Sequence, residues 1–279
     1  MTAADSSSAV AAFRALHRTG CFVLPNPWDA GSAIYLHQLG FKALATTSSG
    51  MAFARGLPDN ARAVPRDAVL AHLREMVPAT PLPVSADFQN GYADGPEGVA
   101  ESVILCAATG VAGLSIEDAT GEDAAPLYEH ALAVERIRAA RAALGSGASA
   151  PLLTARCEAY LTKHPDAARV ALERLVAYAE AGAACLFAPG VRHPVEIAAM
   201  VKAVAPKPVN VLMSGPLEGL TLARLAELGV RRISVGSALA RVAWGAFMRA
   251  ARDLAEGGSF EALGDAASYA ELDAMFRKR

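Results

Sequence analysis

The chain alternates short apolar stretches with longer amphipathic ones eight times between residues 21 and 254. This alternation constrains the fold more than any other feature of the sequence. Short apolar stretches separated by helical ones are typical of parallel strands that are buried on both faces. Eight strand–helix units are the number at which such a sheet closes into a barrel. The sequence therefore predicts an α/β fold, a (β/α)8 TIM-type barrel, with residues 1–279 as a single domain. A doubly wound open sheet is the alternative, but it seldom has eight regular repeats.

Residues typical of helix ends mark the expected boundaries. Gly40, Gly110, Gly182 and Gly229 each follow an amphipathic stretch, as glycine commonly does at the end of a helix. We expect strands at 21–24, 41–46, 83–87, 113–117, 152–157, 185–187, 208–212 and 232–235. We expect helices at 11–18, 30–39, 66–77, 96–109, 131–144, 165–181, 194–204, 221–228 and 238–254. The segment Thr-Ser-Ser-Gly at 47–50 reads as the break after the second strand.

Composition and charge exclude several classes of protein. Hydrophobic residues make up 53% of the chain, which is enough for a sizeable core. The net charge is −2 and no basic block is present, so we expect no nucleic-acid partner. We also expect no membrane partner, because no uncharged apolar run reaches about 18 residues and the N-terminus lacks the pattern of a secretory signal. The four cysteines show no metal-binding spacing, which favours a reduced, cytoplasmic protein.

Polar side chains concentrate at the ends of the expected strands, where barrels of this type carry their active sites. Asp87, Glu117 and Arg156 end the third, fourth and fifth strands. Two neighbouring carboxylates repel each other unless a cation or a proton lies between them. Carboxylate oxygens and water suit Mg²⁺, with Mn²⁺ as a second candidate. Arg156 offers a planar guanidinium to a substrate carboxylate. The pattern predicts a metal and carboxylate pocket.

Each of these residues also has a structural interpretation. A single aspartate after a strand often caps a helix, and Arg156 would equally serve as a buried partner of Glu117. Three such residues on successive strands favour the functional interpretation. Further candidates share a place near the expected barrel mouth: Asn210, Trp28, Tyr92, His130 and His164. Packing or capping is the alternative for those. Strand alternation turns Cys157 away from the side of Arg156, which argues against a nucleophile there.

Seven short segments between about residues 22 and 244 carry a family resemblance. They are DAGSA at 29–33, TTSSG at 46–50, LPD at 57–59, DFQNGY at 87–92, SIED at 115–118, TAR at 154–156 and GVRRISVG at 229–236. In this order and spacing, along a barrel pattern, they resemble the isocitrate lyase/phosphoenolpyruvate mutase superfamily.

The resemblance implies an assembly and a metal site. Members of the superfamily exchange the last helix of the barrel between subunits, so a homo-oligomer, a dimer or a tetramer built from dimers, is expected. Mg²⁺ is expected near Asp87 and Glu117. Asp59 is expected to contribute from farther away, through water.

The resemblance also implies how a substrate is held. The backbone amides of the segment that matches Ser49 and Gly50 bind the substrate carboxylate together with Arg156. Mg²⁺ and the arginine take up negative charge on a pyruvate-like enolate. The expected substrate-binding residues are therefore Ser48, Ser49, Gly50, Arg156, Asn210 and Trp28.

Three departures from the superfamily pattern bear on the reaction. Gln89 stands where members carry a second aspartate, which removes a carboxylate from the surroundings of the metal. The segment ATGEDAAP at 119–126 stands where the lyases carry a Lys-Lys-Cys-Gly-His loop with its acid/base cysteine, and the Lys and Asn of the mutase loop are absent as well. Cys157 and Glu158 follow Arg156 where members usually have Thr-Asp.

The retained pocket and the altered loop together define the functional expectation. We expect a carbon–carbon lyase, similar to isocitrate or 2-methylisocitrate lyase, that acts on a small 2-hydroxy or 2-oxo di- or tricarboxylic acid through a pyruvate-like enolate. An oxaloacetate-type 2-oxo-acid decarboxylase or a phosphonopyruvate-hydrolase-like enzyme is the alternative. A third interpretation, from the missing acid/base loop, is a non-catalytic protein that binds 2-oxo acids.

Overall fold

A computed structural model describes residues 3–60 and 63–277. Its strands are β1 (Phe22–Leu24), β2 (Leu44–Ala45), β3 (Val84–Asp87), β4 (Gly113–Glu117), β5 (Leu152–Arg156), β6 (Cys185–Phe187), β7 (Val209–Leu212) and β8 (Arg232–Ser234). All of them pair in parallel, in the order β1-β8-β7-β6-β5-β4-β3-β2. The Ala45 amide also donates to the Pro25 carbonyl at 3.1 Å, which links β2 back to the end of β1. The sheet is a nearly closed barrel, so the predicted (β/α)8 fold is confirmed.

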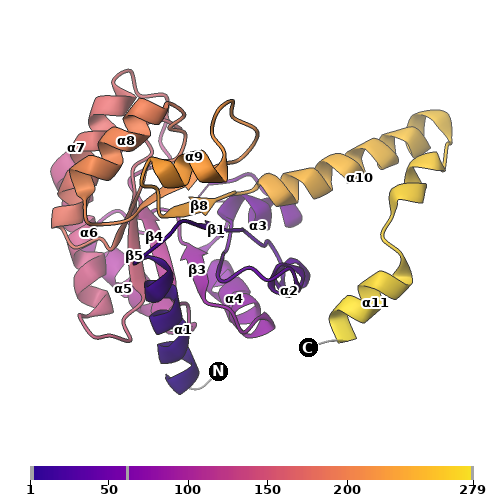
Figure 1. Cartoon of the computed structure of the whole chain (residues 1–279), viewed down its shortest axis with the longest axis horizontal. Helices are drawn as coiled ribbons and strands as arrows, with labels where there is room; N and C mark the ends of the chain where they lie inside the picture. Colours follow the sequence, from indigo (N-terminus) through magenta and orange to yellow (C-terminus); the bar gives the residue numbers. More distant parts are fainter. Residues whose placement is uncertain (1–2, 61–62, 278–279) are drawn as a thin grey trace.

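Helices alternate with these strands and surround the sheet (Figure 1). They are α1 (Ala3–Leu16), α2 (Ala30–Gln38), α3 (Ser48–Ala54), α4 (Arg66–Met76), α5 (Pro96–Ala107), α6 (His130–Leu144), α7 (Ala167–Glu180), α8 (Pro194–Val204), α9 (Leu222–Glu227), α10 (Ala238–Gly257) and α11 (Tyr269–Arg277), with 3-10 turns η1 (Val77–Ala79) and η2 (Glu261–Asp265). The helices expected from the sequence are present, with ends that differ by a few residues.

Helix α1 closes the end of the barrel at which the strands begin. Val10 and Phe13 are fully buried and pack in one cluster with strand residues, among them Leu152 at the start of β5. A Cβ on Gly113 would lie 2.8 Å from the Phe13 ring, so only glycine leaves room for this ring under the sheet. Helix α1 is longer than the expected 11–18, since it begins at Ala3 in the described chain.

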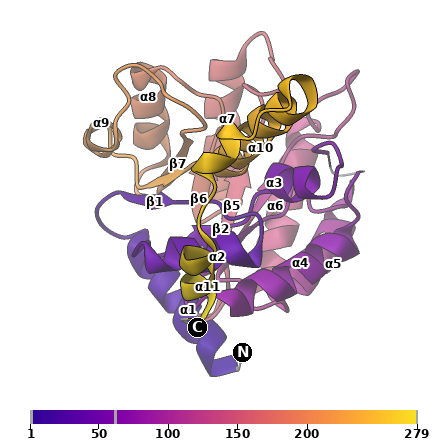
Figure 2. The same ribbon diagram turned by 90° about the vertical axis from the view of Figure 1, so that its right-hand side faces the viewer.

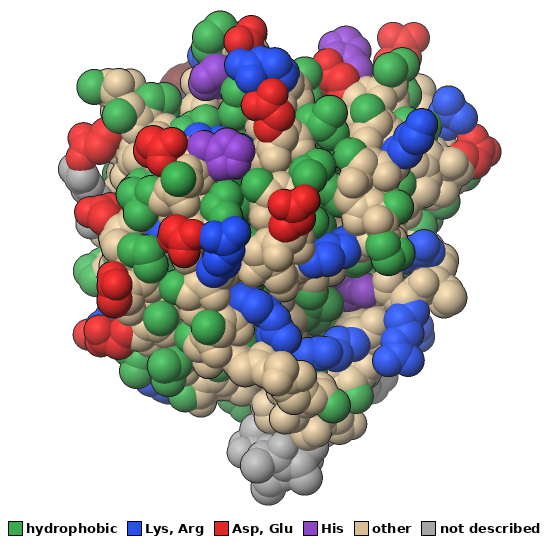
Figure 3. Space-filling view, turned by 90° about the vertical axis from the view of Figure 1, so that its left-hand side faces the viewer, with side chains coloured by type: hydrophobic (Ala, Val, Ile, Leu, Met, Phe, Trp, Pro, Cys, Tyr) green, Lys and Arg blue, Asp and Glu red, His purple; other side chains and the backbone are tan. Residues whose placement is uncertain are grey.

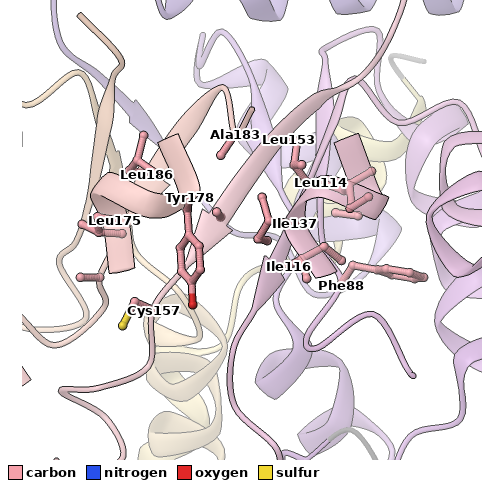
Figure 4. Close-up of a cluster of buried hydrophobic side chains, with 14 of the residues drawn as sticks. Phe88, Leu114, Ile116, Ile137, Leu153, Cys157, Leu175, Tyr178, Ala183 and Leu186 are labelled. Atoms are coloured by element: carbon pink, nitrogen blue, oxygen red, sulfur yellow. The ribbon is translucent and has the colours of Figure 1, made fainter. Parts of the chain in front are cut away.

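The core between the sheet and the surrounding helices is built from small and medium apolar side chains. Figure 4 shows part of it, where Cys157 lies beside Leu175 and Tyr178 of α7. Cys157 is fully buried, and burial raises the pKa of its thiol. This placement agrees with the expectation that Cys157 turns away from the side of Arg156.

The segment at 47–50 differs from the expectation. It was expected only as a break after the second strand, but it forms the first turn of α3. Thr47 is the N-cap, and its hydroxyl accepts a hydrogen bond from the Gly50 amide at 3.2 Å. A threonine side chain can satisfy an amide at a helix N-terminus, which favours a helix over an open turn.

The C-terminal part forms an arm that the sequence did not predict in full. Helix α10 continues to Gly257, past the expected 238–254, and is followed by η2 and α11. Figures 1 and 2 show α10 leaving the barrel and α11 lying beside α2. Val242 and Phe247 on α10 are 70% and 61% exposed, so the arm presents apolar side chains that the described chain does not cover.

The surface carries charges of both signs. On the face in Figure 3, acidic and basic side chains lie among apolar ones. In the described ranges, no helix has the length and the apolar character needed to cross a membrane.

Candidate active site

Arg156 brings the ends of β3, β4 and β5 together. Its Nη1 atom lies 3.2 Å from Oδ1 of Asp87 and 3.1 Å from Oε2 of Glu117. The register of the sheet explains this meeting, since Glu117 pairs directly with Arg156 and Asp87 lies on the next strand. The structure thus places the three residues predicted as the centre of the site side by side.

A third carboxylate, which the sequence did not mark as part of the site, completes this cluster. Glu158 is 4% exposed and accepts a hydrogen bond from Nε of Arg156. Its backbone amide donates to Asp118 at 2.8 Å. Asp118 in turn forms an ion pair at 2.9 Å with the buried Arg174 of α7. Helix α7 therefore fixes the position of the segment after β5 through Asp118. The signal for Glu158 was its place two residues after Arg156, on the same side of an extended chain.

The cluster carries excess negative charge, because three carboxylates surround one guanidinium. Burial raises the pKa of Glu117 well above its usual range; Arg156 opposes the rise, while Glu158 and Asp87 add to it. Burial likewise raises the pKa of Glu158. Burial alone would lower the pKa of Arg156, but Glu117 and its neighbouring carboxylates raise it well above the usual value. Such a cluster favours a further cation or a shared proton.

The start of α3 orients Asp87. The Ser48 amide donates to Oδ2 of Asp87 at 2.9 Å, and the Asp87 amide donates to the Thr46 hydroxyl at 3.0 Å. The Gly50 amide is occupied by Thr47, as described above. Of the two amides predicted to bind the substrate carboxylate, that of Gly50 is therefore engaged within the helix cap, and the neighbouring Ser48 amide is engaged by Asp87.

Asp59 is held by two neutral side chains. It accepts hydrogen bonds from the Ser49 hydroxyl and, at 3.3 Å, from Nε2 of Gln89. Gln89 lies in the tight turn after β3 with a φ of 44°. The residue that replaces the usual second aspartate therefore holds Asp59 with its amide group. Asp59 itself is exposed at the rim of the cavity.

A cavity of about 260 Å³ opens beside this cluster. Of the predicted site residues, those that line it are Ser48, Ser49, Asp59, Asp87, Arg156 and Asn210. Glu117 lies behind Arg156, outside the lining. Trp28 and Gly50 are not part of the lining either; they pack together, since a Cβ on Gly50 would lie 3.0 Å from the Trp28 Cβ. His130 and His164 also lie outside it.

The deeper part of the cavity is lined by polar side chains. Besides Asn210, which was expected in the site, the lining includes Ser85, Ser115 and Arg232, which the sequence did not mark as site residues. Arg232 begins the apolar strand β8 directly after Arg231, and a charge inside the expected strand was the signal that could have placed it in the site.

The donor set fits a hydrated Mg²⁺ ion. Within residues 3–60 and 63–277, no group of three or more His, Cys, Asp and Glu side chains is arranged to bind a metal. Mg²⁺ does not need such a group, because it keeps several waters and often binds only one or two carboxylates. Asp87 and Glu117 would supply oxygen ligands, and the excess negative charge around Arg156 favours a cation there.

The segment at 119–126 forms a closed loop after β4, outside the lining of the cavity. Ala119 and Leu127 form an antiparallel bridge, and the Tyr128 amide donates to the Asp118 carbonyl at 2.9 Å. The Thr120 hydroxyl donates to the Ala125 carbonyl at 2.6 Å. The loop places no lysine, cysteine or histidine near the cavity.

Fold and site together define a class of protein: a (β/α)8 barrel with carboxylates and an arginine at the strand ends beside a polar cavity. Residues 13–255 match the family described as phosphoenolpyruvate phosphomutase, so the chain belongs to this family. The predicted membership in the phosphoenolpyruvate mutase/isocitrate lyase superfamily, whose members are lyases and mutases of carboxylic acids, is thereby confirmed.

Solved structures agree with this assignment. A candidate lyase/mutase from Burkholderia cenocepacia J2315 is 48% identical with a TM-score of 0.92, over 98% of this chain and 97% of its own. The superfamily member 2,3-dimethylmalate lyase is 25% identical with a TM-score of 0.83, over 98% and 94%. Oxaloacetate acetylhydrolase, in complex with its product oxalate, is 27% identical with a TM-score of 0.84, over 96% and 94%.

Proposed function

We propose that this protein is a Mg²⁺-dependent carbon–carbon lyase acting on a small 2-hydroxy or 2-oxo di- or tricarboxylic acid. The observation that carries the proposal is the contact of Arg156 with both Asp87 and Glu117 beside the cavity. Through this contact, the guanidinium that would bind a substrate carboxylate lies next to the two carboxylates that would bind a cation, at the ends of neighbouring strands. The similarity to 2,3-dimethylmalate lyase supports the lyase class.

The roles of the residues follow from their charges. Asp87 and Glu117 would hold Mg²⁺ or Mn²⁺, with Asp59 acting through water. When bound, the metal withdraws electron density from the substrate oxygens. Arg156 donates hydrogen bonds to the substrate carboxylate and stabilises negative charge as a pyruvate-like enolate forms. Ser49 of α3 lines the same cavity, and its hydroxyl is a further polar group available to the substrate.

An oxaloacetate-type decarboxylase or hydrolase is the second candidate. The loop at 119–126 favours it, because no acid/base cysteine, lysine or histidine stands there and two acidic residues, Glu122 and Asp123, do. These acids would repel a phosphonate, which argues against phosphonopyruvate among the substrates. The similarity to oxaloacetate acetylhydrolase also supports this candidate.

One experiment separates these functions. The purified protein with Mg²⁺ is incubated with isocitrate, 2-methylisocitrate, oxaloacetate and phosphonopyruvate, and the products are identified by mass spectrometry. Cleavage of either isocitrate supports the lyase, and loss of oxaloacetate above the rate with free Mg²⁺ supports the second candidate. Binding of pyruvate without turnover of any substrate would identify a binding protein and overturn the proposal.

A matched pair of variants tests the site itself. Arg156→Gln removes the guanidinium that contacts Asp87 and Glu117, and is expected to abolish both turnover and pyruvate binding. Arg138→Gln removes the same charge from an exposed pair on α6 and is expected to change neither. Equal pyruvate affinity in the two variants would place the substrate elsewhere.

We also propose that the C-terminal arm packs against a partner subunit in a dimer or a tetramer. The exposed apolar side chains of α10 support this assembly, because an isolated arm would leave them in water. The superfamily resemblance points to the same exchange of the last helix.

A further inference from the structure

Arg232 lies at the floor of the cavity, deep inside the barrel. It is the first residue of β8 and is only 4% exposed, yet it lines the same cavity as Asp87 and Arg156. Ser115 lines the cavity between these levels and is partly exposed, so the cavity extends inward along β4. A substrate that binds at the strand ends therefore has a path towards this guanidinium.

The partners of Arg232 are all neutral. Its Nε donates to Oδ1 of Asn210 at 2.9 Å, and its Nη2 donates to the Thr154 hydroxyl at 3.1 Å. Its Nη1 lies 3.3 Å from Nε2 of His17. Nδ1 of His17 lies 2.8 Å from the Phe13 carbonyl and must donate to it, which leaves Nε2 as an acceptor.

His17 stays uncharged in this place. Burial, together with the nearby Arg232, lowers the pKa of His17 to about 3. Among the described residues, no aspartate or glutamate lies within salt-bridge distance of Arg232, whereas the partly buried Arg156 and the buried Arg174 both contact carboxylates. A buried charge is costly unless it is paired. Arg232 is thus a buried cation that lacks a counter-charge in the described chain.

We propose that Arg232 is a second anion-binding point that takes the distal carboxylate of a dicarboxylic acid. Its three contacts use three of the five N–H groups of a guanidinium, so donors are left for a ligand. Ser85 and Ser115 line the same part of the cavity and supply hydroxyl donors. This inference rests on the proposed function, which brings the first carboxylate of the substrate to Arg156. The distance between two fixed guanidinium groups then selects the length of the acid.

The test uses two 2-oxo acids with the same number of carbons. 2-Oxoglutarate carries a distal carboxylate, and 2-oxopentanoate carries a methyl group in its place. Calorimetry with the full-length protein and Mg²⁺ is expected to show at least tenfold tighter binding of 2-oxoglutarate. Arg232→Gln is expected to remove this preference while changing the affinity for 2-oxopentanoate less than twofold. Equal binding of the two acids by the unmodified protein would overturn the inference, whether or not the variant folds.

The control is the neighbouring arginine. Arg231→Gln removes the same charge, but Arg231 donates to the Gly20 carbonyl and does not line the cavity. It is expected to keep the preference for 2-oxoglutarate. If Arg231→Gln lost the preference as fully as Arg232→Gln, the preference would depend on net charge and not on Arg232. Failure of the proposed function looks different: neither acid would bind in a manner that depends on Mg²⁺ and Arg156.

Discussion

The buried His17 makes the stability of this protein sensitive to mild acid. Burial lowers the pKa of His17 in the folded protein to about 3, from about 6.5 for an exposed histidine. The unfolded chain therefore takes up the proton first as the pH falls. The contribution of His17 to stability is complete above about pH 6.5 and is lost as the pH falls towards 3.

The size of this loss follows from the two pKa values. At about pH 4.5 protonation of His17 in the unfolded state costs folding about 3 kcal/mol, whereas at pH 7 this cost is negligible. Other groups titrate in the same range, so the effect must be isolated with a variant. His17→Gln keeps an acceptor for Arg232 and cannot titrate.

The assay is urea unfolding of both proteins at pH 7 and about pH 4.5, at one protein concentration because oligomers gain stability with concentration. The unmodified protein is expected to lose about 3 kcal/mol more than His17→Gln does. NMR titration of the histidine ring protons gives an independent value. An equal loss in both proteins, or a titration of His17 near 6.5, would refute the burial argument.

Three further predictions concern packing and assembly. Gly50→Ala is expected to cost about 1–3 kcal/mol and to weaken pyruvate binding, because its Cβ would lie 2.6 Å from a threonine methyl; Gly215→Ala, with nothing within 4 Å, is the control in urea unfolding, and equal stability of the two would contradict the packing. Asp118→Asn is expected to cost about 3–5 kcal/mol by thermal unfolding, because it leaves a buried guanidinium unpaired, and a change below 1 kcal/mol would show that water reaches the pair. Phe247→Asp is expected to reduce the mass measured by light scattering with an unchanged circular dichroism spectrum, and an unchanged mass would exclude α10 from the interface.

The sequence predicted the barrel because its strands are buried on both faces and its helices end in glycines. The lengths of the strands were predicted less well from the sequence. The second strand was expected at 41–46, but regular pairing is limited to Leu44–Ala45. Residues just before this strand, such as Phe41 and Ala43, are apolar because they pack against other elements. Apolar character alone does not distinguish such packing from strand pairing.

The central part of the site was predictable because it depends only on which residues end successive strands. Asp87, Glu117 and Arg156 meet through strand register, which a parallel barrel fixes. Glu158 and Gln89 needed more, since their roles depend on local backbone geometry: the turn after β3 and the amide held by Asp118. Helix α3 was not predicted because Thr-Ser-Ser-Gly at 47–50 is equally typical of a turn and of a capped helix start.

The bridge between Ala119 and Leu127 makes the loop after β4 structurally independent of the strand ends that carry the site. Because the bridge and the Asp118–Tyr128 contact hold both ends, residues 120–126 can be replaced as a unit while the spacing of Glu117 and Arg156 stays the same. A barrel organised in this way can acquire a new reaction by exchanging one short insert, and the rest of the protein need not change.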